Sequence, residues 1–201
     1  METLYLDIET LPAPKEIREM LEEYHRKRIE KGKTEKTFEE FLESTGFDGA
    51  FGRIFCISFA VNNEAVNCLC SGEKQMIEEF WKIAKNINLF VGFNILDFDL
   101  RFIYQRSIVN NIRPSLELPF ARYRNYPIFD IMYEWSKWGT NRINLDGLAR
   151  ALGIPSPKDE GIDGSMVKKF YEMGKTDEIC KYCNRDVLTT REIYKRMTFN
   201  G

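Results

Sequence analysis

The sequence predicts a single α/β domain, and three observations support this prediction. Strand-like segments with period-two alternation and segments with helical periodicity follow one another along the chain. Neither an internal repeat nor a linker rich in Pro, Gly or Ser divides the 201 residues. With 43% hydrophobic and 30% charged residues, the chain has enough apolar side chains for a proper core. We therefore expect one domain over residues 1–201.

Composition also limits the function classes. Apolar stretches span only a few residues, and residues 1–3 lead directly into a strand-like run, so we expect neither a membrane span nor a secretory signal. The net charge of −2, from 29 basic and 31 acidic residues, does not indicate a strongly basic nucleic-acid-binding domain. Five cysteines, an odd number, are typical of reduced thiols. These features predict a soluble, cytoplasmic protein.

The first predicted strand runs from Leu4 to Glu9, before Pro12 and Pro14. Its residues alternate with period two. One face holds Leu4, Leu6 and Ile8, and the other holds Tyr5, Asp7 and Glu9.

Residues 15–45 form a highly charged helical region that breaks near Gly32. We interpret it as an insertion packed on the body of the domain. The only histidine of the chain, His25, lies in this region, and its charged neighbours predict a solvated position on the helix surface.

The remaining elements are predicted from turn residues and from periodicity. Asn62-Asn63-Glu64 favours a hairpin turn, and the prolines between residues 107 and 127 favour a loop-rich segment. The last helix has acids in its first turn and Lys195-Arg196 in its last. In order, we expect strands at 54–61 and 65–70, a helix at 73–85, a strand at 89–92, a helix at 99–106, a strand at 128–129, a helix through Trp135, a helix at 144–152, a loop at 153–165 and a helix at 177–197.

Four acidic side chains are candidates for one metal site. Asp7 and Glu9 share a strand face roughly 6.6 Å apart along the chain, although a solvated strand face explains an isolated D-x-E pair as well. Asp186 lies on the otherwise apolar face of the last helix, where burial requires a cation. A buried arginine is one such cation; a divalent metal shared with Asp7, Glu9 and Asp99 accounts for all four acids. Oxygen ligands without a histidine suit Mg²⁺ or Mn²⁺.

Three short motifs carry a resemblance to a known family. Asp7-Ile8-Glu9-Thr10, Asn94-Ile95-Leu96-Asp97-Phe98-Asp99 and Tyr182-Cys183-Asn184-Arg185-Asp186 resemble the three exonuclease motifs of the DEDD superfamily of 3′-to-5′ exonucleases, in the tyrosine-type (DEDDy) version. The sequence is most similar to the proofreading exonuclease domain of B-family DNA polymerases, in a stand-alone bacterial form, from about residue 3 to residue 197. Lys181 stands where the histidine-type branch has its histidine. Two further stretches resemble the stand-alone bacterial members of this group. They are residues 52–58 and residues 145–149, the second continuing through 153–155 to Asp163-Gly164-Ser165.

This resemblance implies a ribonuclease H-like fold with a mixed sheet of about five strands, the first strand central and helices on both faces. It implies a metal-dependent 3′-to-5′ exonuclease that acts on DNA or RNA 3′ ends with two divalent ions, Mg²⁺ or Mn²⁺, and releases nucleoside 5′-monophosphates. It also implies a role for each site residue. Asp7 bridges both ions, Glu9 and Asp186 complete the nucleophile-side ion, Asp99 holds the second ion, Tyr182 orients the attacking water, Asn94 lies near the substrate strand, and backbone groups near Glu9 and Thr10 receive the terminal 3′-OH.

Other residues allow further interpretations. The arginines at 101, 106, 113, 122 and 124 are either phosphate contacts or ordinary surface charges. Phe51 and Phe93 are either base-stacking groups or, as we favour, core residues.

Three alternative functions remain open. Cys68, Cys70, Cys180 and Cys183 are candidates for a four-thiolate zinc site, which we disfavour because the first pair lies in a strand and the second in the catalytic helix. A phosphatase with Asp7 as nucleophile usually needs a second Asp where Glu9 stands. A non-catalytic nucleic-acid-binding module that retains the exonuclease fold would be expected to lose some of the acids, and all four are present.

Overall fold

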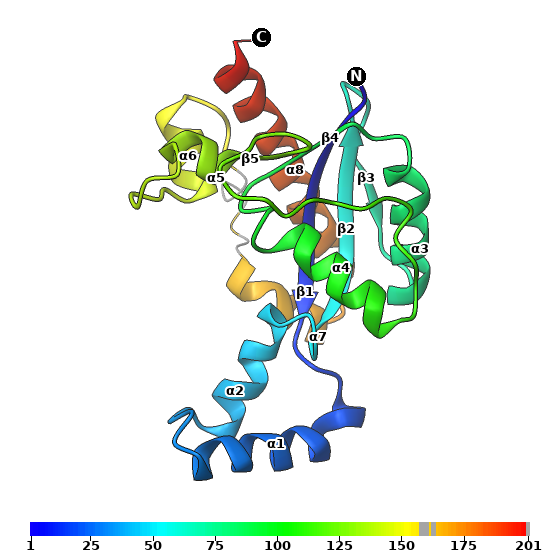
Figure 1. Ribbon diagram of the computed structural model, residues 1–201, viewed down its shortest axis with the longest axis vertical. Helices are drawn as coiled ribbons and strands as arrows, with labels where there is room; N and C mark the ends of the chain where they lie inside the picture. The colour runs from blue at the N-terminus through cyan, green and yellow to red at the C-terminus, as the bar shows by residue number, and fades with distance from the viewer. Residues whose placement is uncertain (157–160, 162–163, 200–201) are drawn as a thin grey trace.

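A five-stranded mixed sheet forms the centre of the computed structural model, which describes residues 1–156, 161 and 164–199 (Figure 1). The strand order is β3-β2-β1-β4-β5, and β1 is central as predicted. Strands β1, β2 and β3 pair antiparallel, whereas β4 pairs parallel with both β1 and β5. The strands are β1 (Thr3–Leu11), β2 (Arg53–Val61), β3 (Asn67–Leu69), β4 (Leu89–Gly92) and β5 (Ile128–Asp130).

Helices cover both faces of the sheet. Helices α3 (Glu73–Ala84) and α4 (Asp99–Val109) pack on one face, and the long helix α8 (Thr176–Thr198) crosses the other. Helices α5 (Ile131–Ser136), α6 (Leu145–Ala151) and α7 (Val167–Glu172) pack against α8. The alternation of β1 is the reason for this layering, because Leu4, Leu6 and Ile8 join the core under α3 and α4. Tyr5 points the other way and packs in the α8 core.

The predicted elements agree closely with the observed ones. The hairpin, the strand at 89–92 and the helices that begin at 73, 99 and 145 are all present, with ends that differ by a few residues. The structure adds α7, in a stretch to which the sequence pattern assigned no element. Part of the predicted loop at 153–165, including Asp163, lies outside the described residues. Within the described part of the chain, no helix is both long enough and apolar enough to cross a membrane.

The predicted insertion is a helical arm, residues 15–44, that projects from the rest of the domain (Figure 1). It contains a 3-10 turn (Lys15–Ile17), α1 (Arg18–Glu30) and α2 (Phe38–Ser44), and the two α-helices pack on each other. Contacts with the body include the ring of Tyr24 against Phe51, 5.5 Å apart, and an ion pair between Glu43 and Lys168. The insertion therefore packs on the body through contacts such as these, as predicted, and α1 and α2 project away from it (Figure 1).

The prediction of a solvated His25 is wrong. Its side chain is buried, its Nε2 is hydrogen-bonded to the Lys36 carbonyl oxygen at 2.9 Å, and its ring stacks on Phe41. The charged neighbours of His25 do form the surface of α1, but the aromatic residues of α2 cover the side on which His25 lies. A pairing between two helices separated by a loop is invisible to the periodicity of one helix.

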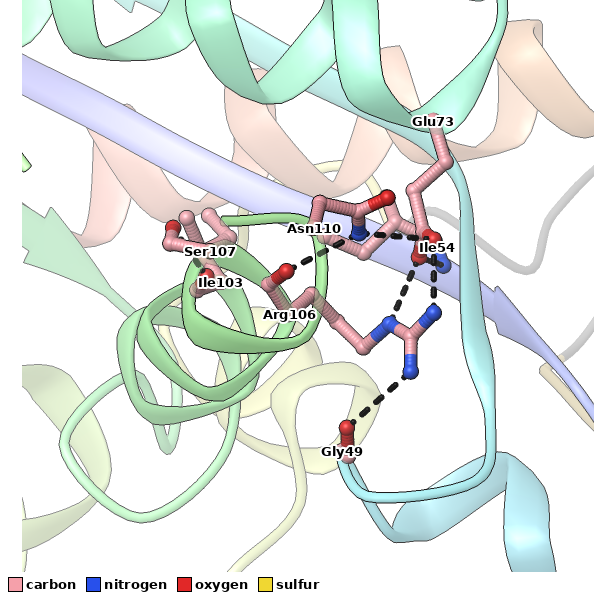
Figure 2. A network of polar contacts seen from close by, with 7 residues as sticks. All are labelled: Gly49, Ile54, Glu73, Ile103, Arg106, Ser107 and Asn110. Atoms are coloured by element: carbon pink, nitrogen blue, oxygen red, sulfur yellow. Dashed lines mark hydrogen bonds and ion pairs between the residues drawn. The ribbon is translucent and has the colours of Figure 1, made fainter. Parts of the chain in front are cut away.

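Glu73, the first residue of α3, holds three elements together (Figure 2). Its carboxylate accepts from Arg106 Nε at 2.9 Å and from Arg106 Nη2 at 2.7 Å. It also accepts from the Ile54 backbone N–H at 2.7 Å and from Asn110 Nδ2 at 3.2 Å. Arg106 donates a further bond to the Gly49 carbonyl oxygen. Arg106 is therefore a buried structural residue, and both interpretations from the sequence, phosphate contact and ordinary surface charge, are wrong for it.

Glu73→Ala is expected to lower the free energy of unfolding by about 3 kcal/mol, because it leaves the buried Arg106 guanidinium and the Ile54 N–H without their acceptor. Glu78→Ala, an exposed glutamate on the same helix, is the matched control and is expected to change it by less than about 0.5 kcal/mol. Urea denaturation of both variants measures the difference. Equal losses in the two variants would show that the network adds nothing to stability.

Candidate active site

The sheet opens beside β1 at the point where its two acidic residues lie. Strand β4 pairs with β1 only from Thr3 to Tyr5. Past this point the carboxylate of Asp99, the first residue of α4, takes the place of a strand neighbour: its Oδ1 accepts from the Ile8 backbone N–H at 3.0 Å. The opening leaves a cleft of about 190 Å³. It is lined by Asp7, Phe93, Asn144, Leu145, Asp146, Tyr182 and Asp186.

Three of the four predicted acids converge at this cleft. Carboxylate oxygens of Asp7, Glu9 and Asp186 lie within 4.8 Å of one another. The first two come from the α8-facing side of β1, and Asp186 comes from α8. The register between β1 and β2 shifts after Glu9, and such a bulge re-aims side chains at the end of a strand. Asp99 is buried next to this group but is not part of it.

Burial and mutual repulsion raise the pKa values of these carboxyl groups. Burial contributes most to the raised pKa of Asp7, followed by Cys183, Asp186, Asp99 and Glu9. The pKa of Glu9 is raised by burial and then by Asp186 and Asp99. Burial raises the pKa of Asp99 to about 7, against hydrogen bonds from backbone amides that lower it. These acids therefore repel one another, and a cation placed among them would relieve the repulsion.

Tyr182 lies one helical turn before Asp186 and lines the same cleft. Its side chain is buried in the wall of the cleft. Burial raises the pKa of Tyr182, and repulsion from Asp186, Glu9 and Asp7 raises it further. The phenol consequently keeps its proton at neutral pH, which makes it a hydrogen-bond donor that faces the acids.

Cys183 is a site residue that the sequence motifs did not single out for this role. Its Sγ donates to Asp7 Oδ2 at 3.1 Å and contacts the Asp7 carbonyl oxygen at 3.5 Å. It lies three residues before Asp186, so both side chains face the sheet from adjacent positions of one helix face. The three-residue spacing between Cys183 and Asp186 was the feature of the sequence that could have identified Cys183 as a site residue.

Neither Thr10 nor Asn94 belongs to the group of acids or to the residues that line the cleft. The Thr10 hydroxyl donates to the Gly46 carbonyl oxygen at 2.7 Å and so fixes β1 to the end of the helical arm. Asn94 has a left-handed backbone conformation, with φ of 60°, in the loop after β4. Phe93, beside Asn94, is half-buried and packs against the core, as favoured from the sequence, and it also lines the cleft. The substrate-binding roles of Thr10 and Asn94 stay predictions.

Asp130, at the end of β5, supports the loop that contains Asn94. Its carboxylate accepts from the backbone N–H groups of Asn94, Leu96, Met132 and Tyr133 at 3.0–3.3 Å. Asp130 is therefore both the N-cap of α5 and the anchor of the loop between β4 and α4. An aspartate between a strand and a helix is a recognisable N-cap signal, but the second partner, 36 residues earlier, is a tertiary contact.

Two of the arginines considered as phosphate contacts pair with Asp97, in the segment between β4 and α4. Arg101 and Arg122 each place a guanidinium nitrogen within 3.9 Å of the Asp97 carboxylate. Both side chains are substantially exposed, so the ion pairs are weak and leave the positive charge accessible to a polyanion.

Comparison with known proteins agrees with this geometry. The family described as "Predicted 3'-5' exonuclease related to the exonuclease domain of PolB" matches residues 50–200. No curated protein sequence matches the chain. Among solved structures, the family B DNA polymerase from the hyperthermophilic archaeon Pyrobaculum calidifontis is similar, with a TM-score of 0.68 and 14% identity. The similarity covers 98% of this chain and 24% of that polymerase, so the chain spans about a quarter of the polymerase's length. At this identity the likeness shows the fold, which is the ribonuclease H-like fold of a polymerase exonuclease domain.

Removal of the Asp99 charge is expected to stabilise the metal-free protein. The pKa of this carboxyl rises from 3.8 to about 7 on folding. The folded state therefore holds the proton more tightly, and in EDTA the free energy of unfolding falls as pH rises from about 4 to about 7. Asp99→Asn keeps an acceptor for Ile8 and is expected to flatten this fall, with a gain of up to about 4 kcal/mol above pH 7.

Urea denaturation across this pH range in EDTA checks the expectation. Asp48→Asn is the matched control, since Asp48 is exposed and its Oδ1 likewise accepts one backbone N–H. If the two variants show the same pH profile, the account of Asp99 fails.

Proposed function

We propose that this chain, which belongs to the family of predicted 3′-to-5′ exonucleases related to the exonuclease domain of PolB, hydrolyses phosphodiester bonds one nucleotide at a time from the 3′ end of DNA or RNA. The reaction depends on divalent metal ions and releases nucleoside 5′-monophosphates. The observation that carries this proposal is the convergence of Asp7, Glu9 and Asp186 within 4.8 Å of one another beside the cleft.

The donor set fits a hard divalent cation. The charged groups that raise the pKa of Glu9 are other carboxylates, so each acid destabilises the ionised form of its neighbours. Carboxylate oxygens are the preferred ligands of Mg²⁺ and Mn²⁺. Asp7, Glu9 and Asp186 would hold one ion, and Asp99, adjacent to Asp7 through Ile8, would contribute to a second. When bound, such ions activate a water molecule and stabilise the leaving 3′ oxygen.

The residues of the chain position the substrate and the water. Tyr182, protonated and one helical turn before Asp186 in the wall of the same cleft, is placed to orient a water molecule beside the acids. Phe93, in the cleft wall, offers an aromatic surface to the terminal base. Arg101 and Arg122 lie on the β4–α4 side with accessible charge for the phosphates of the strand. This arrangement explains how a chain with a net charge of −2 takes a polyanionic substrate locally.

Asp7→Ala is expected to abolish a metal-dependent activity. Oligonucleotides of DNA and RNA, labelled at the 5′ end, are incubated with the protein and Mg²⁺, Mn²⁺ or EDTA. The wild type produces a ladder that shortens from the 3′ end with Mg²⁺ or Mn²⁺ and nothing in EDTA. Glu192→Gln, an exposed acid on α8, is the control and keeps the wild-type rate. A protein that cuts nothing with any metal is a non-catalytic module, and equal rates in Asp7→Ala and wild type would also overturn the proposal.

Tyr182→Phe isolates the role of one hydroxyl group. Loss of the donor is expected to lower kcat at least about 100-fold with little change in KM, because the water is oriented in the transition state rather than during binding. Tyr194→Phe, on the same helix and packed against Tyr5 and Phe129, is the matched control and keeps the wild-type kcat. A Tyr182→Phe enzyme with unchanged kcat would reduce Tyr182 to a packing residue.

A further inference from the structure

All five cysteines of the chain gather between α8 and the β2–β3 hairpin. Cys56 on β2 and Cys68 on β3 face α8 from the sheet. Cys180 and Cys183 face the sheet from α8, three residues apart. Cys70 follows the end of β3, two residues after Cys68, and it lies close enough to Cys180 and Cys68 for both to affect the pKa of its thiol. The gathering follows from topology, because β2 and β3 are neighbours and α8 crosses both.

Three of these thiols already have the spacing of a metal site. The Sγ atoms of Cys56, Cys68 and Cys180 lie within 4.8 Å of one another. Four sulfur ligands at about 2.3 Å around a tetrahedral zinc ion are separated by about 3.8 Å, so side-chain rotations that move these three sulfur atoms by about 1 Å bring them to ligand spacing. We propose that Cys56, Cys68 and Cys180, with Cys70 as fourth ligand, bind a thiophilic divalent cation, Zn²⁺, apart from the carboxylate site.

The structure changes which four thiols form the set. The sequence pattern paired Cys68 and Cys70 with Cys180 and Cys183. Cys183, however, points to Asp7 and donates to its carboxylate at 3.1 Å. Cys56, outside both spacing motifs, takes its place because it lies on the neighbouring strand and faces the same side as Cys68. The position of Cys68 and Cys70 in an extended segment, which counted against a site, is what brings both thiols to one face.

A four-thiolate set favours metal over a simple disulfide. A disulfide uses two sulfur atoms and leaves the third close thiol without a role, and all five cysteines are free thiols here. Hard cations such as Mg²⁺ prefer oxygen ligands, whereas thiolates select Zn²⁺. The two sites therefore differ in the metal they take, although both include residues of α8.

The consequence of binding is a cross-link between α8 and the edge of the sheet. Strand β3 is only three residues long and pairs with β2 alone. A bound ion would fix this edge to the N-terminal half of α8, at Cys180, six residues before Asp186. The site is thus expected to set the position of the helix that carries Tyr182 and Asp186, without taking part in hydrolysis.

Cobalt titration of the reduced, metal-free full chain tests the site independently of nuclease activity. Thiolate ligation gives Co²⁺ an intense near-ultraviolet charge-transfer absorption that carboxylate ligation does not give. We expect this band to saturate at one Co²⁺ per chain and to disappear when Zn²⁺ is added. Cys68→Ser and Cys180→Ser lose the band, whereas Asp7→Asn and Cys183→Ala keep it.

Two further measurements keep the result independent of a folding defect. Cys70→Ser changes an exposed residue and is expected to weaken the band without loss of helical circular dichroism. In the wild type, Zn²⁺ is expected to protect Cys68, Cys70 and Cys180 from alkylation. The proposal is overturned if the reduced wild type gives no thiolate band, if folded Cys68→Ser and Cys180→Ser both keep it, or if Cys68 and Cys180 form a disulfide in a protein that never binds Co²⁺.

Discussion

Three carboxylates are held within 4.8 Å of one another in this domain, and their mutual repulsion is the constraint that its hydrophobic packing creates. Leu4, Leu6 and Ile8 pack in the core on one face of β1. Because side chains alternate along a strand, Asp7 and Glu9 must lie on the opposite face. The apolar face of α8 must cover that same side, and it brings Asp186 with it. Hydrophobic packing on both sides of the sheet thus forces like charges together, and a cation is the natural means of compensation.

Short-range patterns were sufficient to predict most of the fold and the acids of the site. Period-two alternation in β1 assigned the acids to one face, and the helical spacing of α8 placed Asp186 on the face that becomes buried. Because each of these rules concerns one element, it holds before any tertiary contact is known. The convergence of Asp7 with Asp186 followed from the motif resemblance as well as from these faces.

Rules that concern a single element do not predict contacts between distant segments of the chain. The Cys183–Asp7 hydrogen bond, the bonds from Asp130 to the loop after β4 and the place of His25 against α2 each join elements with no shared periodicity. The orientation of the helical arm depends on a few contacts with the body, which a charged amphipathic pattern does not specify. Cys56 belongs to neither of the two cysteine spacing motifs, and only strand pairing places it beside Cys68.

Helix α8 connects the proposed thiolate site with the acidic site, since it carries Cys180, Tyr182, Cys183 and Asp186. The acids at the β1–α8 contact are expected to form a divalent cation site. Anomalous diffraction at the manganese edge, from crystals soaked in Mn²⁺, would locate the ion. We expect an anomalous peak within coordination distance of Asp7, Glu9 and Asp186. Crystals that bind Mn²⁺ elsewhere, with no peak between these carboxylates, would contradict it.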